Sequence, residues 1–231
     1  MISEELSYRD ESVALSGTLF RPTGAARAAI AVFPTILNPT PAVRAKAEAL
    51  AKAGYLTLLA DFYGEAPADF AAAVTLSNAL RAEPRVYRQR LHATLSALTK
   101  EAHGLPLGAI GFCMGGQAVL ELARDSADLA VVASFHGLLD TGAPAAPGAI
   151  KARILVCHGD ADPLVPRDQV RAFWEEMDRA GASWHFHSYS GVAHGFTNPN
   201  RPPSGGPVAY DPSADRQSWS AMLSLFDEVF D

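Results

Sequence analysis

The chain has 231 residues, of which 48% are hydrophobic and 19% charged, and its formal net charge is -6 with an isoelectric point near 5.6. This length and composition suit one domain with a sizeable core, so we expect a single α/β domain over residues 1–231. The acidic balance excludes nucleic acid and anionic membranes as expected partners, because both attract basic surfaces.

The N-terminus and the cysteine count indicate where such a protein is found. The first ten residues, MISEELSYRD, are acidic where a signal peptide needs a basic start followed by an apolar stretch. No apolar run approaches the roughly 20 residues of a membrane span. Two cysteines, Cys113 and Cys157, are too few for a disulfide scaffold or a structural zinc site. We therefore expect a soluble cytoplasmic enzyme or binding protein.

The predicted strands change character along the chain. Residues 6–22, LSYRDESVALSGTLFRP, alternate apolar and polar side chains around an acidic turn, which predicts an antiparallel hairpin. Later strands are continuous apolar runs, as expected where helices cover both faces of a sheet. They lie at 28–34, 55–62, 107–112, 129–135 and 152–159, and residues 184–190, WHFHSYS, predict a further strand.

Helical patterns alternate with these runs. Gly54, Gly104 and Gly181 follow three of the predicted helices as C-caps, and Pro84 begins one of them. The predicted helices lie at 42–54, 84–104, 115–125, 167–181 and 214–230. Strand and helix repeated in this way predict a mostly parallel sheet with right-handed crossovers and helices on both faces.

In such sheets, ligands bind beyond the carboxyl ends of the strands. Three loops at that edge carry reactive side chains. The turn after 107–112 holds Cys113, the loop after 152–158 reads HGDADPLVP, and the loop after 183–189 reads SGVAHGF.

The stretch GFCMGG at residues 111–116 predicts a nucleophile elbow. In that tight strand-to-helix turn, the residues two before and two after the nucleophile must be small, and here they are Gly111 and Gly115. The following helix points its N-terminus at the sulfur, which favours a thiolate, and it offers the backbone N–H of Met114 to a developing oxyanion. The alternative is a small core cysteine beside glycines that only form a turn.

A thiolate nucleophile needs a base and a group that orients the base. His194 lies in a glycine-flanked loop after the last strand, in the expected chain order, while His136 and His158 also end strands at this edge. Either Asp160 or Asp162 could supply the carboxylate, and either could instead cap a turn or a helix. Nucleophile, acid and histidine in this order match the α/β-hydrolase arrangement.

The chain resembles the dienelactone hydrolase family, which are α/β-hydrolases with a cysteine at the elbow. The matching stretches are DFYGE, GFCMGG, FHG, HGDADPLVP and VAHGFTNP followed by AYDPSADRQSW, so the resemblance extends from about residue 28 onward. It implies a triad of Cys113, Asp162 and His194, with Asp160 in a supporting role.

One position departs from the family pattern. The resemblance implies a glutamate in the loop after the first parallel strand, where VFPTILNP has Thr35. The thiol would then be ionised by His194 and the helix N-terminus alone, so we expect weak or absent dienelactone activity. Ile36 in the same loop is expected to donate the second oxyanion N–H. The Thr35 hydroxyl could make a polar contact to substrate or cap the turn.

Residues that recognise the substrate are harder to derive. Arg85 and Arg88 lie in the first turns of a helix, where positive charge opposes the helix dipole, so they could bind a substrate carboxylate. The alternative is a solvated surface, paired with Glu83 or Glu65. Tyr63 and residues 65–80 are predicted to wall the pocket, and His136 to line it.

These residues predict hydrolysis of a small ester, lactone or thioester through a thioester acyl-enzyme, without a metal or other cofactor. Two alternatives remain. A thioesterase or peptidase could use the same triad, and a catalytically idle α/β-hydrolase could bind a small molecule or a protein. The sequence is compatible with a monomer or a homodimer.

Overall fold

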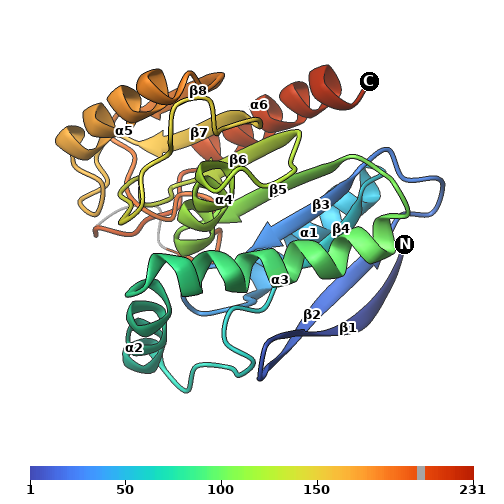
Figure 1. Ribbon diagram of the computed structural model, residues 1–231. Coiled ribbons are helices and arrows are strands. Elements are labelled where there is room, and N and C mark those ends of the chain that lie inside the picture. The colour runs from blue at the N-terminus through green and yellow to red at the C-terminus, as the bar shows by residue number, and fades with distance from the viewer. Residues whose placement is uncertain (202–205) are drawn as a thin grey trace.

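The protein is described by a computed structural model covering residues 1–201 and 206–231. Its strands form one eight-stranded sheet in the order β1-β2-β4-β3-β5-β6-β7-β8 (Figure 1). The first two strands form the predicted antiparallel hairpin, and β3 to β8 run parallel, which confirms the predicted sheet. The strands are β1 (Ile2–Asp10), β2 (Val13–Arg21), β3 (Ala29–Phe33), β4 (Leu56–Leu59), β5 (Leu107–Phe112), β6 (Val131–Phe135), β7 (Arg153–Gly159) and β8 (Trp184–Tyr189).

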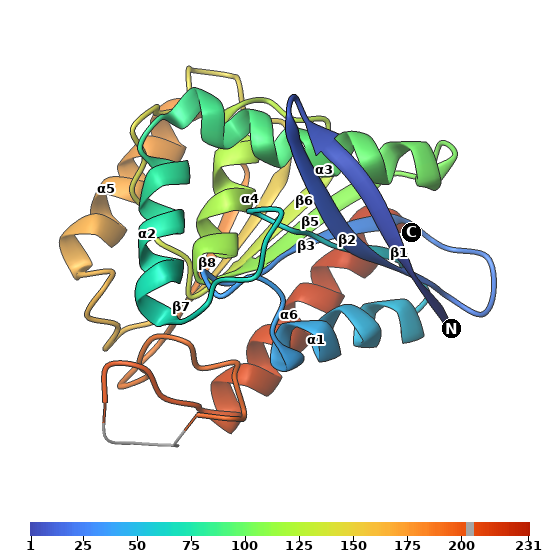
Figure 2. The ribbon, with the colours of Figure 1, turned by 90° about the horizontal axis from the view of Figure 1, so that it is seen from below.

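Helices cover both faces of the sheet, as predicted (Figure 2). One face packs against α1 (Pro41–Lys52) and α6 (Pro212–Phe230). The other packs against α3 (Pro84–Ala102), α4 (Met114–Arg124) and α5 (Arg167–Ala180), with α2 (Phe70–Arg81) beside α3. Because helices exclude water from both faces, β3 and β6 are buried along their whole length, which explains why their sequences are apolar except for Ser134.

The parallel strands bring distant loops to one edge of the sheet. β5 lies between β3 and β6, and β7 and β8 follow beyond β6. Since these strands share one direction, the residues that follow β3, β5, β6, β7 and β8 all emerge at the same edge. The site can therefore be assembled from segments far apart in the sequence without any long excursion of the chain.

Two local predictions differ from the structure. Residues 65–80, expected only as a pocket wall, contain helix α2, which begins after Asp69, whose side chain accepts a hydrogen bond from Ala72 N–H. Few of its side chains are buried, so its sequence lacks a strong apolar stripe. The strand expected at 55–62 ends at Leu59, because the next residues turn around the buried Asp61 carboxylate.

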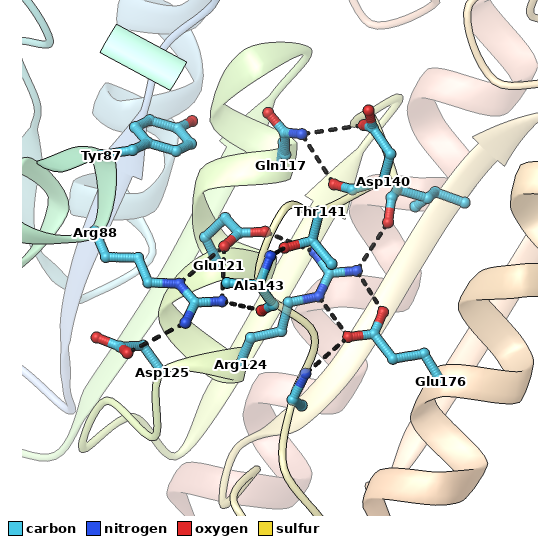
Figure 3. Close-up of polar contacts among 12 residues, drawn as sticks. Tyr87, Arg88, Gln117, Glu121, Arg124, Asp125, Asp140, Thr141, Ala143 and Glu176 are labelled. Atoms are coloured by element: carbon cyan, nitrogen blue, oxygen red, sulfur yellow. Dashed lines mark hydrogen bonds and ion pairs between the residues drawn. The ribbon is translucent and has the colours of Figure 1, made fainter. Parts of the chain in front are cut away.

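A chain of buried charges fixes α4 between its neighbours (Figure 3). The Arg124 side chain is fully buried and makes a two-pronged contact with Glu176 of α5, at 2.7 and 2.9 Å. It also contacts Glu121 at 3.0 Å, and the second oxygen of Glu121 accepts from Arg88 of α3 at 2.9 Å. Arg88 reaches Asp125 at 3.3 Å. The helix that follows Cys113 is thereby tied to α3 and α5.

Arg124→Leu is expected to lower the free energy of unfolding by about 3–5 kcal/mol, because it leaves the Glu176 carboxylate buried without its cation. Urea unfolding of the variant and the parent measures this difference. The control is Arg153→Leu, which removes an ion pair to the largely exposed Glu228 and should leave the unfolding midpoint almost unchanged. Equal midpoints for Arg124→Leu and the parent would contradict this role.

Candidate active site

The turn between β5 and α4 holds Cys113 in an unusual backbone conformation. Its φ is 58° and its ψ is -116°, a region that side chains with a Cβ rarely adopt. The neighbouring backbone sustains this strain. Cys113 N–H donates to the carbonyl of Phe135 at 3.0 Å, and the Cys113 carbonyl accepts from the N–H of Gly116 at 2.9 Å. The sulfur is thereby directed out of the sheet edge.

The glycines around this turn are required by close backbone contacts, as the sequence predicted. A Cβ at Gly111 would overlap the Gly115 carbonyl, and one at Gly115 would overlap the Phe33 carbonyl of β3. A Cβ at Gly116 would lie 2.6 Å from the Cα of Gly137. The elbow therefore has no room for any larger residue at these three positions.

His194 and Asp162 meet beside the turn. His194 Nδ1 lies 2.7 Å from Asp162 Oδ2, and both side chains are buried. Asp162 Oδ1 accepts from Leu164 N–H at 2.9 Å, which orients the carboxylate. Because Nδ1 is taken by Asp162, His194 presents Nε2 to the thiol of Cys113, with which the imidazole is hydrogen-bonded. Asp160 lies elsewhere, paired with Arg167 at 2.6 Å.

The thiol and the imidazole ionise as a pair. Burial raises the pKa of the Cys113 thiol, but the hydrogen bond and charge of His194 outweigh it, so this pKa lies below its ordinary value. Burial alone would lower the pKa of His194, but its hydrogen bonds to Asp162 and Cys113 raise it to about 10. Both shifts favour a thiolate beside an imidazolium over a neutral thiol beside a neutral imidazole.

Two backbone amides also reach the sulfur, those of Met114 and Ile36. These are the two N–H groups that the sequence predicted to face an oxyanion. Tyr63 contacts both residues, since its hydroxyl donates to the Ile36 carbonyl at 3.1 Å and lies 3.4 Å from the Met114 sulfur. Tyr63 thus supports the residues that supply the amides.

The loop that carries Ile36 is held by residues that sequence reasoning missed. Asn38, at φ 62°, donates to Asp61 Oδ1 at 2.7 Å and accepts from Phe62 N–H at 3.0 Å. The same Asp61 oxygen accepts from Tyr63 N–H at 2.9 Å. In the sequence, the available sign of this contact is that Asn38 and Asp61 each stand between apolar residues, in LNP and ADF. Their two loops come together only in the fold.

Thr35 stands where the family resemblance implies a glutamate. Its hydroxyl accepts from Leu37 N–H at 3.2 Å, so it caps the turn, which was one of the two predicted roles. The residue also lines the pocket in front of Cys113.

A pocket of about 150 Å³ opens in front of the thiol. Cys113, His194 and His136 form its floor with Thr35 and Ile36, as expected. Phe70 and Leu164, which are 63% and 51% exposed, stand at its rim. Its remaining walls are largely apolar and include Leu37, Val43, Phe112 and Val208, with Lys46, Asn198 and Arg201 as polar members.

The two predicted arginines lie outside this pocket. Arg88 belongs to the charge chain on α4, where its partners are Glu121 and Asp125 and not Glu83 or Glu65 (Figure 3). Arg85 lines a separate surface depression together with Arg88. The surface alternative describes the exposed Arg85 but not Arg88, whose side chain is largely buried against Glu121. Neither arginine binds at the carboxyl edge of the sheet, because their helix faces α4.

A thiol on a strand–helix turn, facing an imidazole and a carboxylate from later loops at the same sheet edge, is the architecture of the α/β-hydrolase class. Within that class, residues 15–230 match the dienelactone hydrolase family, and the chain belongs to this family.

Two similar proteins of known structure and one further sequence relative support the assignment. A structure described as m3DLH is 34% identical, with a TM-score of 0.92 over 100% of this chain and 99% of that chain. The dienelactone hydrolase-like promiscuous phosphotriesterase P91 from metagenomic libraries is 32% identical, with a TM-score of 0.90 and the same coverage. A Bradyrhizobium sp protein named probable 2-oxo-3-(5-oxofuran-2-ylidene)propanoate lactonase is 29% identical over 208 residues, 84% of this chain and 81% of the relative. The protein is an ester-bond hydrolase of the dienelactone hydrolase type.

A helix that crosses a membrane must be both long and apolar. No helix in the described ranges combines the length and the apolar character needed to cross a membrane.

Alkylation by iodoacetamide tests the ionisation of Cys113. Because the pKa of the thiol is lowered, its reaction rate should stay high at pH values where an ordinary cysteine is protonated, and it should follow one ionisation. Cys157 is the internal control, since burial raises its pKa to about 12 and leaves it unreactive in the folded protein. Peptide mapping after timed alkylation measures both. A rate profile typical of a free thiol at Cys113 would refute the ion pair.

Proposed function

We propose that Cys113, His194 and Asp162 are the catalytic triad of a hydrolase that cleaves small esters, lactones or thioesters through an acyl-enzyme. The observation that carries the proposal is the meeting of thiol and imidazole, with the 2.7 Å contact from His194 to Asp162 behind them. The two amides that reach the same sulfur support it.

In the first half-reaction the thiolate sulfur of Cys113 adds to the substrate carbonyl carbon. The carbonyl oxygen gains the negative charge and accepts hydrogen bonds from the amides of Met114 and Ile36. Collapse of this adduct breaks the bond to the leaving alcohol or thiol, which takes the proton from His194 Nε2. A thioester on Cys113 remains.

The second half-reaction uses the same groups in reverse. His194, now neutral, removes a proton from water as the water oxygen adds to the thioester carbonyl. Collapse breaks the carbon–sulfur bond, releases the carboxylic acid and restores the thiolate beside the imidazolium. Asp162 keeps Nδ1 protonated throughout and so fixes which nitrogen handles the proton.

The pocket favours compact substrates with an apolar group. Phe70, Leu164, Val43 and Val208 line the space beside the sulfur. Thr35 gives no carboxylate that could assist the thiol, so activation falls to His194. We therefore expect weak or absent turnover of cis-dienelactone, measured by product formation, and turnover at the level of the dienelactone hydrolases proper would contradict this part of the proposal.

Cys113→Ala should abolish turnover of p-nitrophenyl acetate apart from the background rate, because no other group can form the acyl-enzyme. Loss of a triad nucleophile costs several powers of ten in rate. Stopped assays of wild type and variant at equal concentration measure the difference, with circular dichroism confirming that the variant is folded. A wild-type rate for Cys113→Ala would rule out the triad, and a rate no higher than background for both proteins would favour an idle site.

Phosphotriester hydrolysis is a second candidate activity, favoured by the 32% identity over the whole chain to the phosphotriesterase P91. Here the thiolate would displace an aryloxide from phosphorus, and water would then cleave the sulfur–phosphorus bond. The phosphoryl oxygen would accept from the amides of Met114 and Ile36. The same two proteins, assayed with diethyl p-nitrophenyl phosphate, decide it: release of p-nitrophenolate by wild type but not by Cys113→Ala is expected, and equal release would exclude it.

A further inference from the structure

A second histidine joins the loop of the thiol to the loop of His194. His136 follows β6 directly, with φ 41°, and its side chain is 3% exposed. Its Nδ1 accepts from the Cys113 N–H at 3.1 Å, a donor that is shared with the Phe135 carbonyl at 3.0 Å, and its Nε2 lies 2.9 Å from Thr197 Oγ1. Thr197 is in the same loop as His194. The imidazole of His136 therefore connects the turn that carries Cys113 with the loop that carries His194.

These contacts determine the tautomer of His136. An amide N–H can only donate, so Nδ1 must be the unprotonated nitrogen and Nε2 must carry the proton that it donates to Thr197. The ring also packs edge-on against His194 and against Phe196, each with 5.2 Å between ring centroids. His136 is thus held on two sides by hydrogen bonds and on two sides by aromatic rings.

The surroundings keep this imidazole neutral. Burial lowers its pKa well below the ordinary value, and the positive charge of His194 acts in the same direction. The charged groups that influence it are His194 and, from α1, Lys46, both of which lower its pKa. A protonated ring would direct a second donor at the Cys113 N–H, so the bridge exists only in the neutral form.

We propose that His136 is a positioning residue, which holds the Cys113 amide on one side and the His194 loop on the other and so fixes the separation of thiol and imidazole. The proposal rests on the catalytic roles proposed for Cys113 and His194. His136 touches no reacting atom in this role. It acts because misplacement of a nucleophile and its base by about 1 Å can cost on the order of 100-fold in rate.

Three substitutions distinguish the contact of His136 with the Cys113 N–H from its contact with Thr197. His136→Leu fills the space and removes both hydrogen bonds, whereas His136→Asn keeps an acceptor oxygen near the place of Nδ1. Thr197→Val removes only the hydroxyl that accepts from Nε2. His158→Leu is the matched control, since His158 is also buried at a strand end and its ring nitrogens have no hydrogen-bond partner in the described part of the chain.

Kinetics on p-nitrophenyl acetate and the pH profile of Cys113 alkylation are measured for each protein. His136→Leu should lower kcat by about 10- to 100-fold with little change in KM, because positioning and not binding is lost. Its alkylation profile should move to higher pH as the thiolate loses His194. His136→Asn keeps the acceptor for the Cys113 N–H but does not reach Thr197, so it should behave like Thr197→Val. Both variants should lose less kcat than His136→Leu and keep a profile closer to the original. The control should keep both.

Wild-type kcat and an unmoved profile for His136→Leu would overturn the proposal, and so would an asparagine variant as impaired as the leucine variant. If the leucine variant does not fold, the comparison of His136→Asn with Thr197→Val decides. A similar, moderate loss of kcat in His136→Asn and Thr197→Val would support the bridge, and wild-type kcat in either variant would overturn it. The proposed function fails separately, through activity in Cys113→Ala, and the alkylation profile needs no substrate.

Discussion

The structure depends on one steric constraint: three backbone segments must lie very close to one another beside Cys113. Gly111 and Gly115 let the elbow close against itself and against β3, and Gly116 lets β6 and its following loop approach. The turn holds Cys113 at φ 58°, which aims the sulfur out of the sheet edge and its own N–H back toward Phe135 and His136. The position of the proposed nucleophile, its backbone amide and the proposed His136 bridge all depend on the same few close contacts.

The electrostatic character of the site follows from that geometry. Burial of the thiol disfavours the thiolate, yet His194 and two amides outweigh this effect and lower the pKa of Cys113. The positive charge then resides on His194, which Asp162 stabilises from behind. One imidazole in the site is charged and the other, His136, is neutral. This division matters for the proposed mechanism, in which His194 exchanges a proton, whereas His136 can hold the Cys113 amide only while it has none on Nδ1.

Much of this could be predicted from the sequence, because the relevant constraints are local or follow from strand order. Apolar runs predicted the buried parallel strands, GFCMGG predicted the elbow, and the family resemblance chose Asp162 over Asp160. What could not be predicted depends on partners far along the chain. Arg88, near the start of a helix, was a candidate for binding a substrate carboxylate, but in the fold it pairs with the Glu121 carboxylate. Helix α2 shows little apolar periodicity because it buries few side chains. The bridging role of His136 needed the position of a threonine 61 residues away.

The central claim is that the thiolate of Cys113 forms a covalent bond to the acyl group of the substrate. The most direct measurement is acid quenching of the enzyme within its first turnovers of p-nitrophenyl acetate, followed by mass spectrometry of its peptides. The account predicts one acetyl group per chain, on the peptide that contains Cys113, and its loss on return to neutral pH. Rapid turnover with no acyl group on that peptide, or with the group on another residue, would contradict it.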